Sequence, residues 1–147
     1  MLVRALVPAD FLAALERVDE WCGETVHEPV PPVFFHHFGG YAVVEDDELI
    51  GLLIGFRSFT NRDVAYIHFT AVHPERRGEG IGSNLYERFE RQAHTWGSTW
   101  IEAVADPENQ SAVDFHESKG FWKELVPDWA GPGSDRWVLR KRIAPAL

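Results

Sequence analysis

The feature of this chain that most restricts its fold is a run of glycines between two segments of different character. Gly78, Gly80 and Gly82 fall within the sequence GEGIGS. Upstream of them, residues 64–72 (VAYIHFTAV) are β-branched and aromatic, as in a strand. Downstream, apolar residues recur at helical spacing over 85–96. The sequence therefore predicts a strand, a tight turn and a helix in that order, with the helix covering about residues 82–96.

A glycine-rich turn at the start of a helix is suited to binding an anion. The first amides of a helix have no carbonyl partner within it, and the helix dipole adds partial positive charge there. Glycines also let a phosphate approach the backbone closely. An ordinary surface loop before a helix has the same pattern, so the glycines alone leave both interpretations open.

Two common phosphate-binding motifs are absent from this stretch. No Gly-Lys-Ser or Gly-Lys-Thr sequence occurs in the chain, which excludes the Walker pattern. Ser83 stands where the pattern G-x-G-x-x-G requires its third glycine. The expected phosphates are therefore not those of a P-loop or a Rossmann dinucleotide site.

Length, composition and charge narrow the class of protein further. The 147 residues suit a single domain over residues 1–147 with one core. The one cysteine, Cys22, excludes an internal disulfide framework, and no histidine or cysteine spacing indicates a metal site. No apolar run approaches the roughly 20 residues that cross a bilayer, and no signal peptide is visible, so we expect a cytoplasmic protein without membrane contact. The formal net charge of −9 argues against a nucleic-acid partner and is compatible with a cationic substrate such as an amine.

The first half of the chain carries strand and helix patterns in alternation. We expect a strand near the N-terminus and then a helix over about residues 11–21, capped by Asp10. The sequence VFFHHFGG predicts a short second helix that ends at its glycines. Residues 41–72 predict three antiparallel strands joined by turns at EDDE and TNRD.

The second half closes the predicted sheet. After the long helix we expect a strand at residues 99–105, a helix capped by Asn109 or Ser111, and two closing strands. The predicted order is β-α-α-β-β-β-α-β-α-β-β. It corresponds to an α/β (α+β) domain with a mixed, mostly antiparallel central sheet flanked by helices.

The glycine stretch and a later element together resemble the GNAT superfamily of N-acetyltransferases. The family signature R/Q-x-x-G-x-G/A is met by Arg77, Gly80 and Gly82. A second family element reads N-x-x-A-x-x-Φ-Y-x-x-x-G-F, where Φ is apolar. It is met at Asn109, Ala112, Phe115, Gly120 and Phe121. The departure from the family pattern is His116, which stands where the family usually has tyrosine.

The resemblance implies that acetyl-CoA is the co-substrate and that no metal is needed. The CoA pyrophosphate would be held by main-chain amides of the loop and helix start, at Arg77, Gly78, Glu79, Gly80, Ile81, Gly82 and Ser83. Ala71 and Val72 would pair with the pantetheine arm like an added strand, and Asn109 would hydrogen-bond the arm. If the side chain of Arg76 or Arg77 also contacts phosphate, reversing it to glutamate should raise the Kd about tenfold for 1.4 kcal/mol lost. The backbone amides could equally carry the binding alone.

Acetyl transfer to an amine requires a base for the amine, donors for the carbonyl oxygen and a proton for the leaving thiolate. By resemblance, the transfer is direct within a ternary complex and the amide of Val72 is the oxyanion donor. His68 is the candidate base, as in related arylalkylamine acetyltransferases, with packing against the sheet as its alternative. Tyr66 shares the strand face of His68 and is expected to line the substrate pocket. His116 would donate a proton to the CoA sulfur in place of tyrosine, or would merely order the arm.

The acetyl acceptor is expected to be a small primary amine. By resemblance, two segments would line its site; they carry Trp21, Glu24, Glu28, Phe34 and Phe35 in one and Asp128, Trp129, Asp135 and Trp137 in the other. A protein N-terminus or a lysine is the alternative acceptor, and a non-catalytic acyl-CoA-binding module is the alternative to an enzyme. Many members of the family are dimers, so a homodimer is a further expectation.

Overall fold

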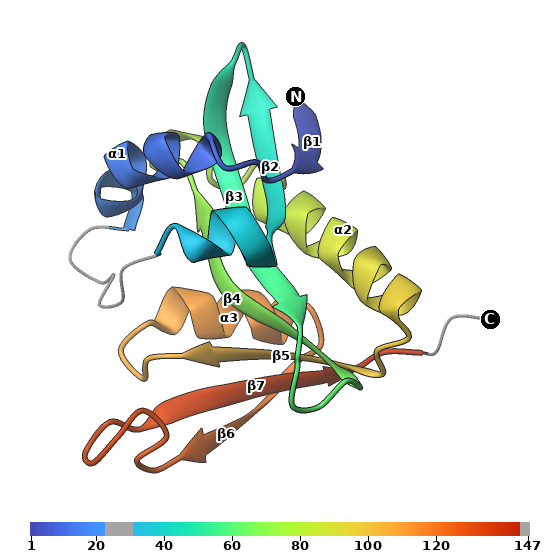
Figure 1. Ribbon diagram of the computed structural model, residues 1–147. Helices are drawn as coiled ribbons and strands as arrows, with labels where there is room; N and C mark the ends of the chain where they lie inside the picture. The colour runs from blue at the N-terminus through green and yellow to red at the C-terminus, as the bar shows by residue number, and fades with distance from the viewer. Residues whose placement is uncertain (23–30, 145–147) are drawn as a thin grey trace. The chain divides into compact units, whose positions relative to one another are not determined.

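The computed structural model of the chain describes residues 1–22 and 31–144, without the side chains of residues 18–20 and 22 (Figure 1). Its strands are β1 (Leu2–Ala5), β2 (Gly40–Glu45), β3 (Glu48–Arg57), β4 (Val64–Val72), β5 (Trp100–Ala105), β6 (Trp122–Val126) and β7 (Arg136–Arg142). Its helices are α1 (Asp10–Cys22), the π-helical turn η2 (Phe34–Phe38), the 3-10 turn η3 (Pro74–Arg76), α2 (Ile81–Trp96) and α3 (Gln110–Ser118). The predicted order of elements and the predicted start of the long helix are confirmed.

The seven strands follow the order β1-β2-β3-β4-β5-β7-β6 in one sheet. Antiparallel pairing joins β1 to β2, β2 to β3, β5 to β7 and β6 to β7, whereas β4 and β5 run parallel. The predicted fold class, a mixed and mostly antiparallel sheet with helices, is therefore confirmed. Contacts group the chain into two compact units: a first unit of residues 1–56 and 68–92, and a second unit of residues 57–67 and 93–147. That residues 1–147 form a single domain stays a prediction.

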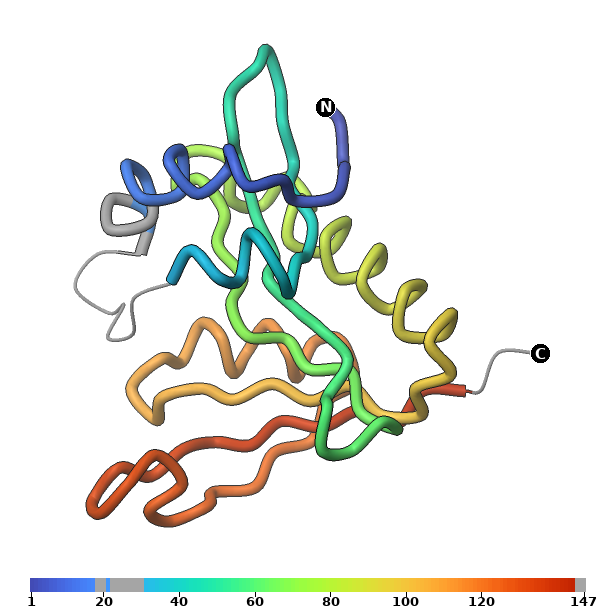
Figure 2. The backbone as a smooth tube through the Cα atoms, in the orientation of Figure 1, coloured from blue at the N-terminus to red at the C-terminus, as the bar shows by residue number. Residues whose placement is uncertain are grey.

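The first unit is organised around the hairpin of β2 and β3, whose turn is visible as an extended loop in Figure 2. Asp46 and Asp47 form this turn with φ values of 51° and 60°, and Glu45 and Glu48 are paired across it. Both central residues have positive φ, as a two-residue turn between twisted strands requires, and aspartate tolerates that conformation. The turn predicted at EDDE is confirmed.

The two faces of β3 pack against different helices. Leu52 and Ile54 belong to the buried cluster that also contains Ala14 of α1 and Phe35 of η2. Gly51, at the alternate position, lies against Ile81 and Leu85 of α2 on the other face. Figure 1 shows α1 and α2 on opposite sides of β3. This alternation follows from the two-residue period of a strand, and it places the start of α2 against the sheet.

The segment VFFHHFGG forms a wider helical turn than that of an ordinary α-helix. The amide of Gly39 donates to the carbonyl of Phe34 at 2.6 Å, which spans five residues, and Gly39 has φ 92°. The predicted short helix is present as a single π-helical turn that ends at the glycines. Positive φ at Gly39 is the reason the helix cannot continue as an ordinary α-helix.

The second unit contains a parallel pair and an antiparallel hairpin. The first four residues of β4 pair with β5 from Val64↔Trp100 to Ile67↔Ala103. β7 lies between β5 and β6 and is antiparallel to both. The buried side chains of this unit include Ile101, Val113, Phe121, Val138 and Leu139.

One buried ion pair fixes the start of α1. Asp10 is 6% exposed and accepts from Arg4 at 2.8 Å and from the amide of Val7 at 2.8 Å. Burial by itself raises the pKa of the Asp10 carboxyl, but these two hydrogen bonds and the charge of Arg4 outweigh it, and the net pKa lies below the usual value. The Asp10 carboxylate, at the first residue of α1, thus binds two residues that precede the helix, Arg4 and Val7.

We expect Asp10→Asn to lower the free energy of unfolding by about 1–3 kcal/mol at pH 7, because a charged acceptor is removed from buried donors. The folded-state pKa of Asp10 is depressed, so its contribution is present above the unfolded pKa of about 3.9 and is lost as the pH falls through the folded value. Urea unfolding at pH 7 and at pH 3 would measure this, with the exposed Asp47→Asn as a matched control. An equal loss at both pH values would contradict the assignment.

Among the described residues, the structure has no helix of sufficient length and apolar character to cross a bilayer.

Candidate active site

The glycine-rich loop lies between η3 and α2 in the first unit. Gly78 and Gly80 have φ values of 85° and 82°, and a Cβ built on either would meet no atom within 4 Å. At the start of α2, the amide of Asn84 donates a hydrogen bond to the carbonyl of Gly80, at 2.9 Å. The amides of Ile81 and Gly82 come before Asn84 in the chain. At the start of a helix such amides have no carbonyl of the same helix to bond to. Exposed loop backbone, open space and a helix N-terminus together fit an anion.

Close packing fixes the start of α2 against the sheet. Ile81 and Leu85 are 1% and 0% exposed. A Cβ on Gly51 of β3 would lie 2.8 Å from Cγ2 of Ile81, 3.4 Å from Cδ1 of Leu85 and 3.5 Å from the carbonyl of Ala71. Gly51 is thus the residue that allows the helix to approach the strands. Its role was not predicted, although a glycine within the apolar run ELIGLLIGF is the signal for such an approach.

Both arginines before the glycines have partners within the first unit. Arg76 donates through Nε to Glu79 Oε2 at 2.7 Å and through a terminal nitrogen to Glu45. These bonds raise the pKa of Arg76, and the arginine in turn lowers the pKa of Glu45. Arg77 donates to the main-chain carbonyl of Trp21 near the end of α1. The charge of Arg76 is therefore matched by two carboxylates, whereas Arg77 has a carbonyl as its hydrogen-bond acceptor.

We expect Arg76→Gln to change the affinity for CoA by less than about threefold, because its guanidinium already serves Glu45 and Glu79 and the backbone remains to bind the phosphates. Isothermal titration with CoA would measure the change. A rise in Kd of about tenfold would instead assign the side chain to the phosphates.

Strand β4 shows the burial alternation expected from the sequence. Ala65, Ile67 and Ala71 are buried, whereas Tyr66 and His68 are half-buried. Tyr66 belongs to the second unit, where its Cα is paired with that of Glu102. Tyr66 and His68 are therefore exposed enough to contact a ligand.

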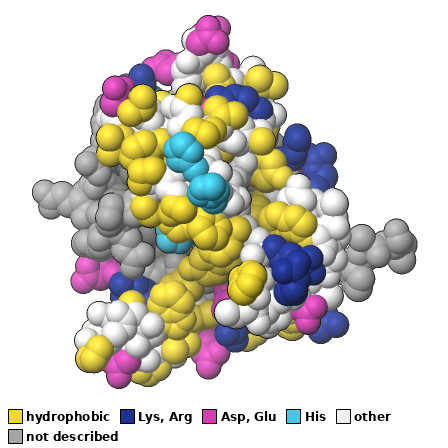
Figure 3. All heavy atoms as spheres, viewed as in Figure 1, with side chains coloured by type: hydrophobic (Ala, Val, Ile, Leu, Met, Phe, Trp, Pro, Cys, Tyr) yellow, Lys and Arg dark blue, Asp and Glu magenta, His cyan; other side chains and the backbone are white. Residues whose placement is uncertain are grey.

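His68 is part of an aromatic cluster in the first unit. Its ring is stacked on Phe34, with centroids 4.4 Å apart and planes 15° apart. Phe34 also contacts Phe38 and Phe56, at 5.2 and 6.2 Å. Figure 3 shows histidine side chains among hydrophobic ones over η2, where Phe38 is half exposed. The cluster offers an apolar, aromatic surface beside one imidazole.

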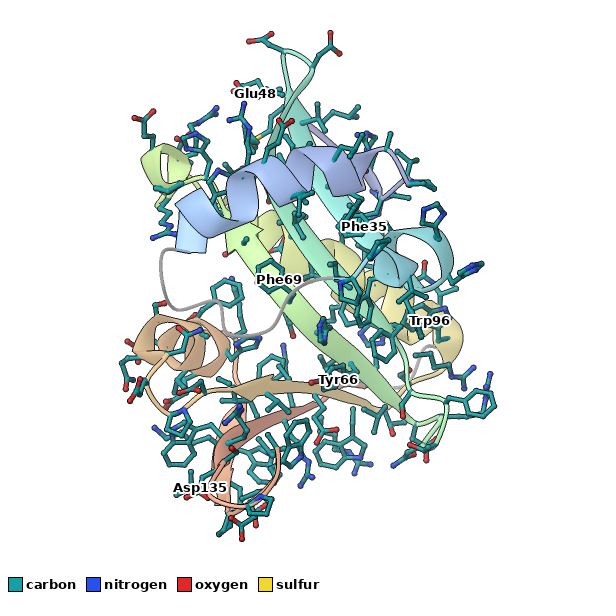
Figure 4. All side chains as sticks on the ribbon, turned by 60° about the vertical axis from the view of Figure 1, so that its left-hand side comes forward. Phe35, Glu48, Tyr66, Phe69, Trp96 and Asp135 are labelled. Atoms are coloured by element: carbon teal, nitrogen blue, oxygen red, sulfur yellow. The ribbon has the colours of Figure 1, made fainter. Side chains whose placement is uncertain are left out.

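Phe35 is buried beneath the surface of η2, whereas Phe69 is half-buried, like Phe34 and His68. In Figure 4, Phe35 projects from η2 and Phe69 from β4. Phe35 is buried in the cluster that contains Ala71, and Phe69 packs against that cluster. Phe35, predicted to line the acceptor site, is thus a core residue.

Thr70 is a polar residue of β4 that the sequence analysis did not single out as a site residue. Its Oγ1 is buried and has no hydrogen-bond partner within the part of the chain that the structure describes. It lies one residue before Ala71 and two before Val72, which were predicted to pair with the pantetheine arm. A hydroxyl among apolar strand residues was the available signal, because buried hydroxyls are normally satisfied.

Asn109 caps α3 in the second unit. Its Oδ1 accepts from the amide of Ala112 and from the hydroxyl of Ser111, each at 3.2 Å. The predicted choice between Asn109 and Ser111 as the cap is settled in favour of Asn109. With its oxygen engaged in the cap, the amide nitrogen of Asn109 is the group that would bind the arm.

His116 lies in the last turn of α3 and is 7% exposed. Its Nδ1 lies 2.7 Å from the carbonyl of Ala112, one turn earlier, and its buried Nε2 has no hydrogen-bond partner among residues 1–22 and 31–144. Burial lowers the pKa of His116, and the bond to Ala112 opposes that shift only in part. The ring meets Phe115 and Phe121 edge to face, at 5.4 and 5.0 Å.

The residues predicted to line the acceptor site divide into three groups. Glu24 and Glu28 lie outside the described residues. Trp21 is buried, and its ring lies 5.8 Å from that of His73. In the second unit, Asp128, Trp129 and Asp135 lie in the loop between β6 and β7, and Trp137 lies on β7.

That loop uses its acidic residues internally. Asp135 accepts from the amide of Asp128 at 2.9 Å, and Asp128 accepts from the amide of Gly133 at 2.7 Å. Lys123 lies over the ring of Trp137 at 4.7 Å, whereas Trp129 is half exposed. The two aspartates thus stabilise the loop conformation, and Trp129 is the aromatic residue of the set that is most exposed.

Within residues 1–22 and 31–144, no group of three or more histidine, cysteine, aspartate or glutamate side chains is arranged to hold a metal ion.

Comparison with known proteins agrees with this arrangement. The family model described as "Acetyltransferase (GNAT) family" matches residues 9–121. The L-amino acid N-acyltransferase MnaT of Escherichia coli is 29% identical over 105 residues, which cover 67% of this chain and 60% of that protein. The matched region thus spans less than two thirds of that relative's length.

Solved structures share the fold. A structure described as an acetyltransferase of the GNAT family from Desulfovibrio desulfuricans has a TM-score of 0.83 at 20% identity, over 97% of this chain and 100% of that one. The protein yncA of Salmonella typhimurium, solved with its cofactor acetyl-CoA, has a TM-score of 0.77 at 17% identity, over 100% of this chain and 96% of that one.

Proposed function

Because this chain belongs to the GNAT acetyltransferase family, we propose that it transfers an acetyl group from acetyl-CoA to a small primary amine by direct transfer in a ternary complex. The proposal is supported mainly by the open, exposed backbone of the loop from Arg77 to Ser83 at the start of α2. Gly78 and Gly80 leave open space over its backbone, within the region that the family match covers. A solved structure of the same fold contains acetyl-CoA, which supports this co-substrate.

The first unit would hold the phosphates and the start of the pantetheine arm. Main-chain amides at positions 77–83 would donate to the pyrophosphate, with the positive end of α2 behind them. Ala71 and Val72 would pair with the arm through their backbone, and the hydroxyl of Thr70 would offer it a further polar contact. The amide of Val72 would donate to the thioester oxygen as charge develops there.

The second unit would contribute Asn109, Tyr66 and His116. The amide nitrogen of Asn109 would donate to the arm while its oxygen keeps the cap of α3. Tyr66, half-buried on β4, would line the acceptor side. The co-substrate supplies a thioester carbonyl, whose carbon a neutral amine can attack without a covalent enzyme intermediate.

An amine acceptor is supported by charge and by aromatic surface. The net charge of −9 favours the approach of a cation, and the rings of Phe34, Phe38 and Phe56 give an apolar part of the acceptor a surface to contact. The relative MnaT is named as an N-acyltransferase of L-amino acids, most of which are small primary amines.

A panel of acceptors tests the proposal. Small amines, amino acids, and peptides with a free N-terminus or a free lysine would each be incubated with acetyl-CoA. Thiol release would be followed, and the product mass recorded. We expect acetylation of at least one small amine, faster than that of any peptide. If acetyl-CoA binds and no acceptor is acetylated, the chain is an acyl-CoA-binding module; if only peptides react, it is a protein acetyltransferase.

A further inference from the structure

Arg136, the first residue of β7, has more hydrogen-bond donors than partners. Its side chain is only 18% exposed, and its Nη1 donates to the carbonyl of Asp135 at 2.9 Å. A guanidinium carries five N–H donors, and among residues 1–22 and 31–144 this is the one hydrogen bond that Arg136 makes. A largely desolvated cation thus keeps most of its donors for another acceptor.

The carboxylate that faces Arg136 belongs to Asp106, just after β5. Because Ala105 pairs with Trp137 in the two strands, the next position brings this carboxylate opposite Arg136. Oδ2 of Asp106 and Nη1 of Arg136 are 3.8 Å apart, which allows attraction but is too long for a hydrogen bond. Through Oδ1, Asp106 accepts instead from the amide of Glu108, at 2.9 Å. The pair therefore orients the guanidinium without occupying its remaining donors.

The other charged side chains around this loop are engaged elsewhere. Asp128 and Asp135 each accept from a main-chain amide of the loop between β6 and β7. Lys123, on β6, lies over the ring of Trp137 at 4.7 Å. Among these described residues, none supplies an acceptor to the remaining donors of Arg136.

A carboxylate is the acceptor that such a guanidinium binds best. Its two oxygens match two parallel N–H groups of the planar fork, and low exposure reduces competition from water. The amide of Asn109 donates to the carbonyl of Asp106 at 2.9 Å, so one short turn carries both residues. Within the second unit, a carboxylate on Arg136 would therefore lie at the same end of β5 as Asn109, the residue proposed to bind the pantetheine arm.

We propose that Arg136 binds the carboxylate of the acetyl acceptor, and that the acceptor is an amino acid rather than an amine without an acidic group. This inference rests on the proposed function and narrows it. In that function the phosphates of the co-substrate take their donors from the backbone of the glycine loop. The acceptor is then the reactant that brings a carboxylate to Arg136.

Matched acceptors isolate the contribution of the carboxylate. Leucine, leucinamide and isopentylamine share a side chain and a primary amine, and phenylalanine, phenylalaninamide and phenethylamine form a second set. We expect Arg136→Gln to lower the ratio of kcat/KM for the amino acid over its amide about tenfold or more in at least one set, through the KM of the amino acid. Activity on the amide should stay within about twofold. Because the ratio is compared between parent and variant, differences in amine basicity cancel.

Two further variants control for charge and for folding. Arg142→Gln makes the same change at the far end of β7, where the guanidinium is exposed over the ring of Trp100, and it should keep the parent ratio. Arg136→Lys keeps the charge beside Asp106 but loses the two-pronged geometry, so it should restore part of the ratio. Thermal unfolding of each variant would confirm that it is folded.

Calorimetric titration gives a readout without turnover. Leucine and phenylalanine would be titrated into the complex of the full chain with CoA, and we expect Arg136→Gln to raise the Kd of the amino acid about tenfold. The Kd for acetyl-CoA should change less than about twofold. A tenfold rise in the Kd for acetyl-CoA with an unchanged acceptor ratio would assign Arg136 to the co-substrate and overturn the proposal.

The remaining outcomes separate this site from the proposed function. Equal losses on the amino acid and on its amide would give Arg136 a structural role and overturn the proposal. A parent that acetylates amines, with an acceptor ratio that Arg136→Gln leaves unchanged, would overturn the carboxylate site and leave the function standing. A parent that binds acetyl-CoA and acetylates nothing would overturn both.

Discussion

Replacing Gly80 by aspartate should weaken acetyl-CoA binding by about ten- to hundredfold, and replacing it by asparagine should weaken it much less. Gly80 has φ 82°, and its missing Cβ faces open space at the loop that would hold the pyrophosphate. A carboxylate there would lie a few ångströms from two phosphate charges, and a like-charge repulsion of about 1–3 kcal/mol corresponds to that loss of affinity. Asparagine has nearly the same shape and no charge, so the difference between the two variants isolates the electrostatic part.

The backbone should tolerate both substitutions. Asp46, Asp47 and Asp128 already adopt positive φ in this chain, at 51°, 60° and 57°. Gly97→Asp is a matched control, because Gly97 also has φ 78° and open space but follows the far end of α2. Calorimetric titration with CoA at two salt concentrations would measure the effect, which added salt should reduce. If Gly80→Asp and Gly97→Asp bound CoA equally well, the loop would not be the phosphate site.

Local patterns in the sequence were sufficient to predict the elements of the fold. The period-two run at 64–72 and the helical period after the glycines appear as β4 and α2. The turn at EDDE was predictable because aspartate tolerates positive φ. The cap of α3 could be narrowed to Asn109 or Ser111 because an N-cap acts on its own helix, and the structure shows Asn109. Each of these features is decided by residues a few positions apart.

Contacts between distant residues could not be predicted in this way. Arg76 meets Glu45 across 31 positions and Arg77 meets the carbonyl of Trp21 across 56, so spacing gave no indication that either guanidinium was engaged. The glycine motif located the candidate anion site through the backbone, which depends on local conformation. The side chains around that site depend on which strand and helix lie beside it.

His116 shows where these two kinds of information meet. The sequence placed a histidine at the tyrosine position, but the donor or acceptor character of a histidine depends on the bond made by its other nitrogen. That bond goes to Ala112, four residues earlier on the same helix, so its geometry is local. The burial that lowers the pKa of the ring is not local, because it also depends on Phe121 beyond the helix.

The close approach of α2 to β3 leads to a second large effect. We expect Gly51→Val to lower the free energy of unfolding by about 3 kcal/mol, because even a Cβ at this position would lie 2.8 Å from Cγ2 of Ile81 and valine adds two further methyl groups. Since Ile81 is the first residue of α2, the displacement should also move the amides of the glycine loop and raise the Kd for CoA. Urea unfolding and calorimetric titration of the same variant would measure the two effects.

A double-mutant cycle can assign this effect to the contact with Ile81. Leucine has no methyl group on Cβ, so Ile81→Leu removes the atom that opposes a side chain at position 51 and should itself cost less than about 1.5 kcal/mol. The milder Gly51→Ala is suited to the cycle, and we expect Ile81→Leu to recover part of its loss, as a coupling free energy of about 1 kcal/mol. Additive losses would show that β3 cannot accept a side chain at position 51 for a reason other than its contact with Ile81, for example the contact with Leu85 or with the carbonyl of Ala71. In that case the start of α2, and the loop that precedes it, would be held by different contacts.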